Sequence, residues 1–216
     1  MIPDPLTLVS RLLILMFAFP IHEFAHAWVA DRFGDPQPRL DGRLSLNPAV
    51  HLDLMGSLIL LVAGFGWARP VSVSPYILRR RSPAALMWVS LAGPISNLIL
   101  AVLAAIPIRF GWLPVIPIKI DGQPVDLVLA IVGNFVIINL VLLFFNLIPI
   151  APLDGEKILD YFLPPNMSIK LEAISQYGPM ILMALLFIGP MIGIDILGQT
   201  LWPLVSLLYG VLTGRG

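Results

Sequence analysis

Long apolar runs separated by short polar segments dominate this chain of 216 residues. A helix needs about 20 mostly apolar residues to cross the hydrocarbon core of a bilayer. The stretches that reach this length are residues 6–30, 84–108 and 127–150, with a C-terminal pair at 174–194 and 196–212 that forms either two spans or one helical hairpin. The pattern predicts an all-α polytopic membrane protein, a helical bundle of about five transmembrane spans.

A shorter apolar stretch, residues 54–66, lies between the first two spans. Apolar runs of about 10–14 residues more often re-enter the membrane or pack inside a protein than cross the bilayer. On either side of this stretch, residues 39–45 and 70–74 alternate apolar and polar positions, which is the period of a strand. We therefore expect a short re-entrant and β-hairpin segment on the cytoplasmic side.

Arginine is concentrated between the first two spans, at Arg32, Arg39, Arg43, Arg69, Arg79, Arg80 and Arg81. Cytoplasmic loops of membrane proteins carry such an excess of Lys and Arg. The loop before the third span has only Arg109 and Lys119, and the segment after that span has Lys157 and Lys170. We expect a multi-pass protein of the cell membrane, with its N-terminus outside and its C-terminus in the cytoplasm.

Composition excludes several classes of function. Charged residues make up 12% of the chain, whereas soluble domains contain about 25%, and the formal net charge of +0 offers no basic surface for nucleic acid. The chain has no cysteine, so disulfides, thiolate zinc sites and cysteine nucleophiles are excluded. We see no internal repeat, and we expect a single membrane domain over residues 1–216, with a core at 6–163 and additional C-terminal helices at 172–213.

The residues His22-Glu23-Phe24-Ala25-His26 form an HExxH pattern within the first span. Side chains four positions apart share a helix face and lie about 6 Å apart along the axis, so both imidazoles can reach one tetrahedral zinc ion. A carboxylate at Glu23 then lies beside the metal as a general base. An ionisable group at the centre of a membrane helix costs about 2.5–3.5 kcal/mol and normally marks function. The alternative is a pair of interfacial histidines bonded to backbone groups, with Glu23 reaching the interface.

Asp154 is the candidate third ligand, in the segment Asn146-Leu-Ile-Pro-Ile-Ala-Pro-Leu-Asp154-Gly155. The prolines interrupt the helix, which is tolerated at membrane depth where protein or a water-filled cavity satisfies the freed backbone groups. The C-terminal ends of the first and third spans, where His26 and Asp154 lie, face one side only if an odd number of crossings lies between those two spans. The 84–108 span is that crossing if residues 54–66 turn back. Alone, Asp154-Gly155 would be better explained as a helix cap. Together with HExxH and this parity, the pattern favours a ligand.

These motifs resemble those of the site-2 protease family of intramembrane metalloproteases. The likeness rests on HEFAH in the first span, residues 92–97 (AGPISN) in the second and the segment from Asn146 to Gly155 after the third, over about residues 6–163. It implies a zinc enzyme that hydrolyses peptide bonds in or near transmembrane segments of other membrane proteins, in regulated intramembrane proteolysis. It also implies His22, His26 and Asp154 as ligands of one Zn²⁺ per chain, with Glu23 as base.

Many members of that family carry a PDZ or CBS domain, and this sequence resembles a compact form with neither. We therefore expect the gating of substrates to depend on the membrane core, on a regulatory membrane partner or on homo-oligomerisation. The expected partners are a transmembrane protein substrate and the lipid bilayer.

Asn146, Asn97 and His51 are secondary candidates for contact with the substrate or its developing oxyanion. A fixed amide donor suits an oxyanion, and for Asn146 this reading and a structural interhelical hydrogen bond are equally favoured. For Asn97 the structural bond is favoured. For His51, at the start of the short apolar stretch, an interfacial histidine bonded to backbone is favoured over a contact with water or substrate.

Two other functions remain as alternatives. A transporter or metal carrier would spread acidic residues and histidines through several spans, whereas here they cluster at one depth. An inactive scaffold that binds transmembrane helices would have no need of the costly carboxylate of Glu23. The sequence therefore favours the protease.

Overall fold

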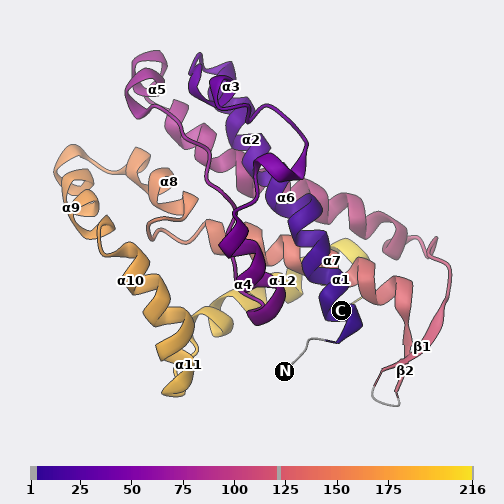
Figure 1. Ribbon diagram of the computed structural model, residues 1–216. Coiled ribbons are helices and arrows are strands. Elements are labelled where there is room, and N and C mark those ends of the chain that lie inside the picture. The colour runs from indigo at the N-terminus through magenta and orange to yellow at the C-terminus, as the bar shows by residue number, and fades with distance from the viewer. Residues whose placement is uncertain (1–3, 121–122, 216) are drawn as a thin grey trace.

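The computed structural model describes residues 4–120 and 123–215, which are predominantly helical (Figure 1). Helices long and apolar enough to cross a membrane cover Pro5–Arg32, Ala85–Arg109, Leu127–Asn146 and Ile196–Thr213. A further candidate span is the pair Pro165–Ser175 and Gly178–Met191, whose halves are bent by 63°. The predicted all-α polytopic fold is confirmed.

The helices follow one another as α1 (Pro5–Leu13), α2 (Phe19–Arg32), α3 (Gln37–Leu40), α4 (Leu54–Ala63), α5 (Pro75–Arg81), α6 (Ala85–Arg109), α7 (Leu127–Asn146), α8 (Asp154–Phe162), α9 (Pro165–Ser175), α10 (Gly178–Met183), α11 (Gly189–Met191) and α12 (Ile196–Thr213). A π-helical turn, Ile14–Ala18, joins α1 to α2, and another, Ala184–Ile188, joins α10 to α11. Pro20 and Pro190 follow these turns closely. A proline ring clashes with the carbonyl four residues earlier, and the wider turn makes room for it.

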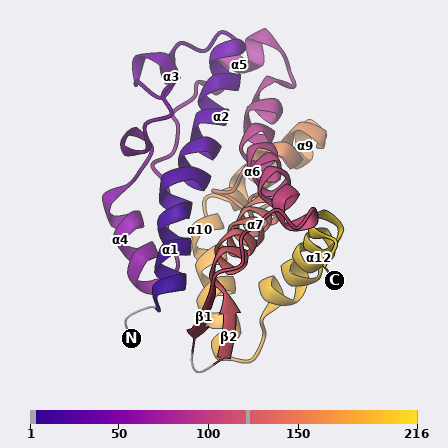
Figure 2. The same cartoon turned by 90° about the vertical axis from the view of Figure 1, so that its right-hand side faces the viewer.

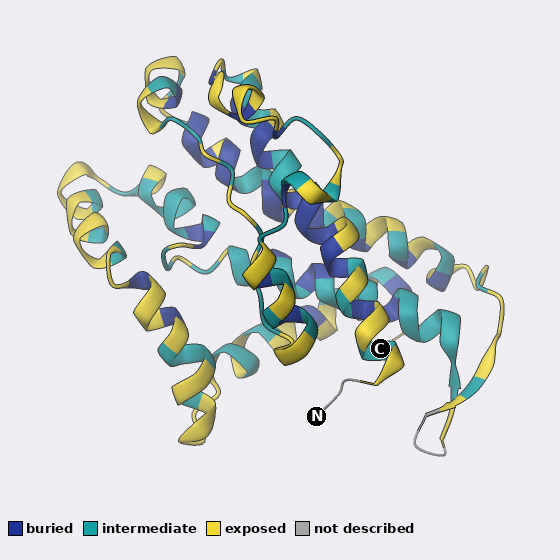
Figure 3. Cartoon of the chain, in the orientation of Figure 1, coloured by how far each residue is buried: buried dark blue, intermediate teal, exposed yellow. Residues whose placement is uncertain are grey.

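Helix α6 lies between α2 and α7 in the middle of the bundle (Figure 2). Small residues of α6, Ala101 and Ala105, pack with Val136 and Leu140 of α7 and Val205 of α12 in one buried cluster. Buried residues concentrate on α2, α6 and α7, whereas α9 to α12 are largely exposed (Figure 3). The best-packed helices are therefore those that carry the predicted motifs.

The chain reverses direction at the end of helix α4, as expected for residues 54–66. Asp53 caps its start by accepting a hydrogen bond from the amide of Gly56 at 2.8 Å, and Gly64, with φ of 79°, ends it. The flanking residues Leu52 and Ala68 form an antiparallel bridge, and the amide of Arg69 donates to the carbonyl of His51 at 2.8 Å. Because the two ends of the segment are paired with each other, the chain leaves it on the side where it entered.

The strands predicted at residues 39–45 and 70–74 are absent from the described structure, and that prediction is wrong. Residues Gln37–Leu40 form α3, and residues 70–74 are extended without a strand partner. The guanidinium group of Arg43, which is 3% exposed, donates to the carbonyls of Val50, Arg69 and Pro70 at 2.8–3.1 Å. These carbonyls therefore have a side-chain donor in place of a strand ladder. The described sheet is instead a hairpin between α6 and α7, in which β1 (Pro117–Ile120) pairs antiparallel with β2 (Gln123–Asp126).

One contact conflicts with part of the predicted topology. Arg109, at the end of α6, donates to the carbonyl of Val211 near the end of α12 at 2.7 Å. The prediction puts the end of α6 outside and the C-terminus inside, yet a single side chain joins the two helix ends. The expected alternation treats residues 174–194 and 196–212 as two spans or one helical hairpin, whereas the chain is bent by 63° between Pro165–Ser175 and Gly178–Met191.

Candidate metal centre

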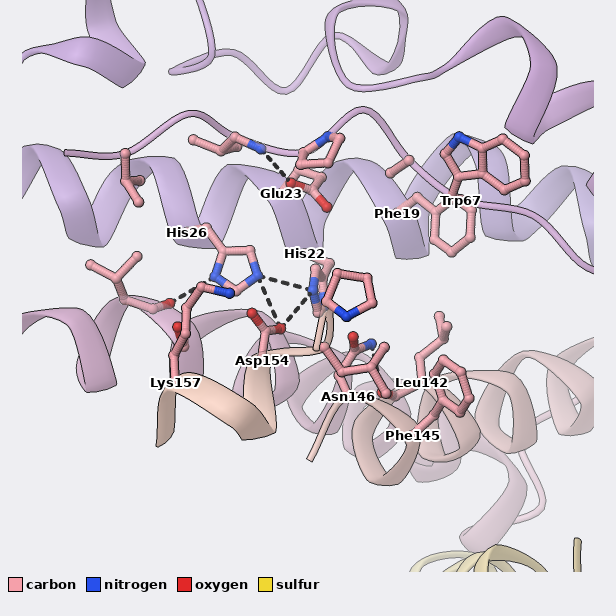
Figure 4. Close-up of a pocket in the computed structure, with 18 of the residues that line it drawn as sticks. Phe19, His22, Glu23, His26, Trp67, Leu142, Phe145, Asn146, Asp154 and Lys157 are labelled. Carbon is pink, nitrogen blue, oxygen red and sulfur yellow. Dashed lines mark hydrogen bonds and ion pairs between the residues drawn. The ribbon is translucent and has the colours of Figure 1, made fainter. Parts of the chain in front are cut away.

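His22 and His26 lie one turn apart on the buried face of α2, toward α6 (Figure 4). Their side chains meet edge to face, with Nε2 atoms 3.0 Å apart. Both residues are less than a tenth exposed. The spacing of the HExxH pattern thus brings two imidazole nitrogens to one point inside the bundle.

Asp154, the first residue of α8, places its Oδ2 atom 3.3 Å from the Nε2 atom of each histidine. Gly155 lets the start of α8 pack against the end of α7, since a Cβ atom at this position would lie 2.3 Å from the carbonyl oxygen of Leu147.

The other ring nitrogens fix the tautomers of both histidines. Nδ1 of His26 lies 2.7 Å from the carbonyl oxygen of Val89, and Nδ1 of His22 lies 2.7 Å from Oδ1 of Asn97. Asn97 donates to Oδ1 of Asn139 at 3.0 Å, and Asn139 donates to the carbonyl of Phe135 at 2.8 Å. Because a carbonyl can only accept, this chain orients both amides and requires a proton on Nδ1. Neutral imidazoles then present bare Nε2 atoms to each other.

This donor set fits a zinc ion. A tetrahedral zinc with bonds of about 2.0–2.2 Å holds its ligand atoms about 3.3–3.6 Å apart, and the three separations here are 3.0, 3.3 and 3.3 Å. Oδ2 of Asp154 is buried without a hydrogen-bond partner and lies 3.3 Å from the Nε2 atom of each histidine, and these nitrogens carry only lone pairs when the imidazoles are neutral. Mutually facing acceptors repel one another unless a cation lies between them. Among the described residues, His22, His26 and Asp154 form a group able to hold a metal.

Gly93 of α6 lies directly against this group. A Cβ atom at Gly93 would lie 2.4 Å from Nε2 of His26 and 2.5 Å from Nε2 of His22. The absence of a side chain at Gly93 lets α6 pack closely on α2, which carries both histidines. Only glycine leaves room for the imidazoles at this point.

Glu23 lies on the opposite side of the histidine pair from Asp154 (Figure 4). Its Oε2 atom accepts a hydrogen bond from the backbone amide of Val71 at 3.1 Å. Val71 belongs to the extended segment 70–74, which Arg43 holds through the carbonyl of Pro70. The general-base candidate is therefore oriented by the loop after α4.

A cavity of about 300 Å³ opens beside these residues and is lined by both histidines, Glu23, Asp154 and Asn146. Asn146 donates to the carbonyl of Leu142 in its own helix at 2.9 Å. His51 is fully buried and outside this lining, with its Nε2 atom 2.6 Å from the carbonyl oxygen of Ser45. The cavity thus includes Asn146 from the secondary candidates, whereas Asn97 contacts His22 from behind and His51 has a backbone partner.

Two residues of the site were missed by the sequence analysis. Asn139 completes the amide chain behind His22. Lys157, one turn after Asp154 in α8, lines the cavity beside it. A polar amide in the middle of an apolar span was a signal for Asn139, since such a group needs a partner. A lysine in a short polar helix gave no comparable signal.

Comparison with known proteins gives consistent results. The model of "Peptidase family M50" matches residues 114–188. A protein of Bacillus subtilis (strain 168) named "Putative zinc metalloprotease YwhC" is 38% identical over 209 residues, which cover 94% of this chain and 89% of that protein.

Two mycobacterial proteins, both named "Putative zinc metalloprotease Rip2", are similar to this chain over shorter regions. The Mycolicibacterium smegmatis (strain ATCC 700084 / mc(2)155) protein is 36% identical over 172 residues, 77% of this chain and 62% of that protein. The Mycobacterium tuberculosis (strain ATCC 25618 / H37Rv) protein is 30% identical over 185 residues, 84% of this chain and 68% of that protein. No solved structure matches the chain significantly.

Proposed function

Because the chain belongs to peptidase family M50, the site-2 proteases, and is thus a zinc metalloprotease with membrane-spanning helices, we propose that His22, His26 and Asp154 hold its zinc and that Glu23 is the general base. The observation that carries this proposal is the meeting of two bare Nε2 atoms with an orphaned carboxylate oxygen, all within 4.8 Å. One such group supports one zinc ion per chain.

Bound zinc would act as a Lewis acid that polarises the scissile carbonyl and makes the attacking water more acidic. Glu23 accepts the proton of that water and passes it to the leaving amine. The amide of Val71 holds one oxygen of this carboxylate at 3.1 Å. The other oxygen then remains available for proton transfer.

Asn146 is the proposed donor to the developing oxyanion. Its Nδ2 atom carries two protons, and the bond to the carbonyl of Leu142 uses one of them. The second proton is available to a substrate carbonyl in the cavity. A fixed amide donor at this position stabilises charge that appears only in the transition state.

The proposed substrates are transmembrane segments of other proteins, cleaved after local unwinding. The carbonyls of a regular helix are hydrogen-bonded and enclosed by the helix. An intact substrate helix therefore cannot place a carbonyl in a cavity of about 300 Å³. We propose that helix-breaking residues in the substrate favour cleavage, and that the site lies near the cytoplasmic face, with the N-terminus outside. A regulatory membrane partner or a second copy of the chain would then control access.

Glu23→Gln tests the mechanism, with Glu172→Gln in exposed α9 as a matched control. Zinc per chain and cleavage are measured for purified proteins with single-span substrates whose helices are uninterrupted or contain Gly-Pro. We expect Glu23→Gln to keep its zinc and lose cleavage, while the control cleaves like the wild type and prefers the Gly-Pro substrate. A Glu23→Gln variant that cleaves normally refutes the assignment of the base, and equal cleavage of both substrates refutes the need for unwinding.

A further inference from the structure

The outer face of the α2–α6 pair carries an apolar groove that plays no part in the proposed catalysis. It has a volume of about 500 Å³ and runs between Trp28 and Val29 of α2 and Trp88, Ile95 and Ile99 of α6. None of its lining residues belongs to the cavity beside the metal ligands. The groove is therefore a surface separate from the cavity beside the histidines.

One end of the groove leads to a basic cavity. Phe33 lines both the groove and a second cavity of about 350 Å³, which Arg80 and Arg81 of α5 line in turn. Arg32 lines the same end of the groove, with its Cζ atom 5.0 Å from the centre of the Trp28 ring. Figure 2 shows α5 beside the adjoining ends of α2 and α6.

The arginines at this end lack acidic partners. Within residues 4–120 and 123–215, arginine ion pairs join Arg39 to Asp31 and Arg79 to Asp160, and none includes Arg32, Arg80 or Arg81. Arg80 instead packs over the ring of Tyr76, 5.6 Å from its centre. Three guanidinium groups thus lie at the end of an apolar groove without an ion pair to a carboxylate.

The length and depth of the groove match one leaflet of a bilayer. Trp88 and Ile99 are separated by about 16 Å of helix, and half of a hydrocarbon core of about 30 Å is about 15 Å. Trp28 and Trp88 are 46% and 48% exposed at the basic end. Exposed tryptophans are typical of the membrane interface, where their rings sit at the level of the headgroups.

We propose that this surface is a binding site for one anionic phospholipid. Its phosphate contacts Arg80, Arg81 and Arg32, and one acyl chain lies along the groove between α2 and α6. Basic pockets between transmembrane helices bind anionic headgroups in this way. A substrate helix in the groove would lie behind the metal ligands, on a surface that shares no residue with their cavity, so a lipid fits the site better.

The test is lipid binding to the purified full-length protein in detergent, measured by native mass spectrometry with phosphatidylglycerol and phosphatidylcholine of equal chain length. An arginine near an anionic lipid surface contributes about fivefold in affinity. We expect wild-type protein to prefer phosphatidylglycerol at one site. Arg80→Gln/Arg81→Gln should reduce this preference by about 25-fold, and Arg32→Gln alone by about fivefold. The readout is independent of proteolysis, so it stands apart from the proposed function.

Lys119→Gln/Lys170→Gln removes the same charge away from the groove and should leave the preference unchanged. Ile95→Trp narrows the groove and should weaken the binding of both lipids. The proposal is overturned if the arginine variants keep the preference, or if the lysine control loses as much, which would indicate diffuse attraction. Displacement of the lipid by glycerol phosphate would indicate a simple anion site, and displacement by a transmembrane substrate peptide would indicate a substrate groove. Either result also overturns the proposal.

Discussion

Gly93→Ala is the sharpest test of how α6 positions the proposed metal ligands. The new methyl group would lie 2.4 Å from Nε2 of His26 and 2.5 Å from Nε2 of His22. An ordinary contact of these atoms is about 3.5 Å, so the imidazoles must retreat by about 1 Å. A displacement of this size at a catalytic centre costs about 100-fold, and disturbed support of metal ligands costs about 10–100-fold in affinity. We expect zinc affinity to fall by about 100-fold.

Zinc affinity is measured by competition with a chromophoric chelator, alongside thermal unfolding of the metal-free protein in detergent. Alanine is favoured over glycine within a helix by about 1 kcal/mol, and this gain offsets the cost of displacing the imidazoles, so metal-free Gly93→Ala should unfold near the wild-type temperature. Gly133→Ala in α7 is the control, because its methyl group would meet only the hydroxyl of Tyr209, at 3.2 Å. Wild-type zinc affinity in Gly93→Ala would show that α6 does not press on the ligands and would refute the reasoning.

Other substitutions separate the roles of the surrounding residues. Asn97→Leu removes the acceptor of the His22 Nδ1 proton and should lower zinc affinity about 10–100-fold in the same competition assay; unchanged affinity would mean that the bond does not orient His22. Asn146→Leu should reduce turnover much more than zinc content, and equal loss of both would exclude the oxyanion role. Arg43→Met leaves three carbonyls without their donor and should destabilise the protein by about 3 kcal/mol, measured by thermal unfolding; a wild-type unfolding temperature would count against this role.

The helices and the meeting of His22 with His26 were predictable because local rules determine them. Apolar length sets the spans, and the four-residue spacing of His22 and His26 sets their common face. Asp154 was predicted from a topological condition, namely that residues 54–66 turn back, and the structure meets this condition through the bridge between Leu52 and Ala68. The proximity of Asp154 to the histidines, which are distant in sequence, was therefore predictable by counting membrane crossings.

The remaining features depend on contacts that no local pattern encodes. Residues 39–45 have the alternation of a strand, yet the guanidinium group of Arg43 binds the carbonyls of Val50, Arg69 and Pro70, and only the last of these lies in a predicted strand. Helix α7 carries Asn134, Asn139 and Asn146, and the partner of Asn97 depends on the axial register of α6 against α7. Uniformly apolar helices leave that register to packing, which cannot be read from the periodicity of either helix. The polar chain behind His22 thus becomes visible only once both helices are placed, although the cost of each buried amide already requires that such a partner exists.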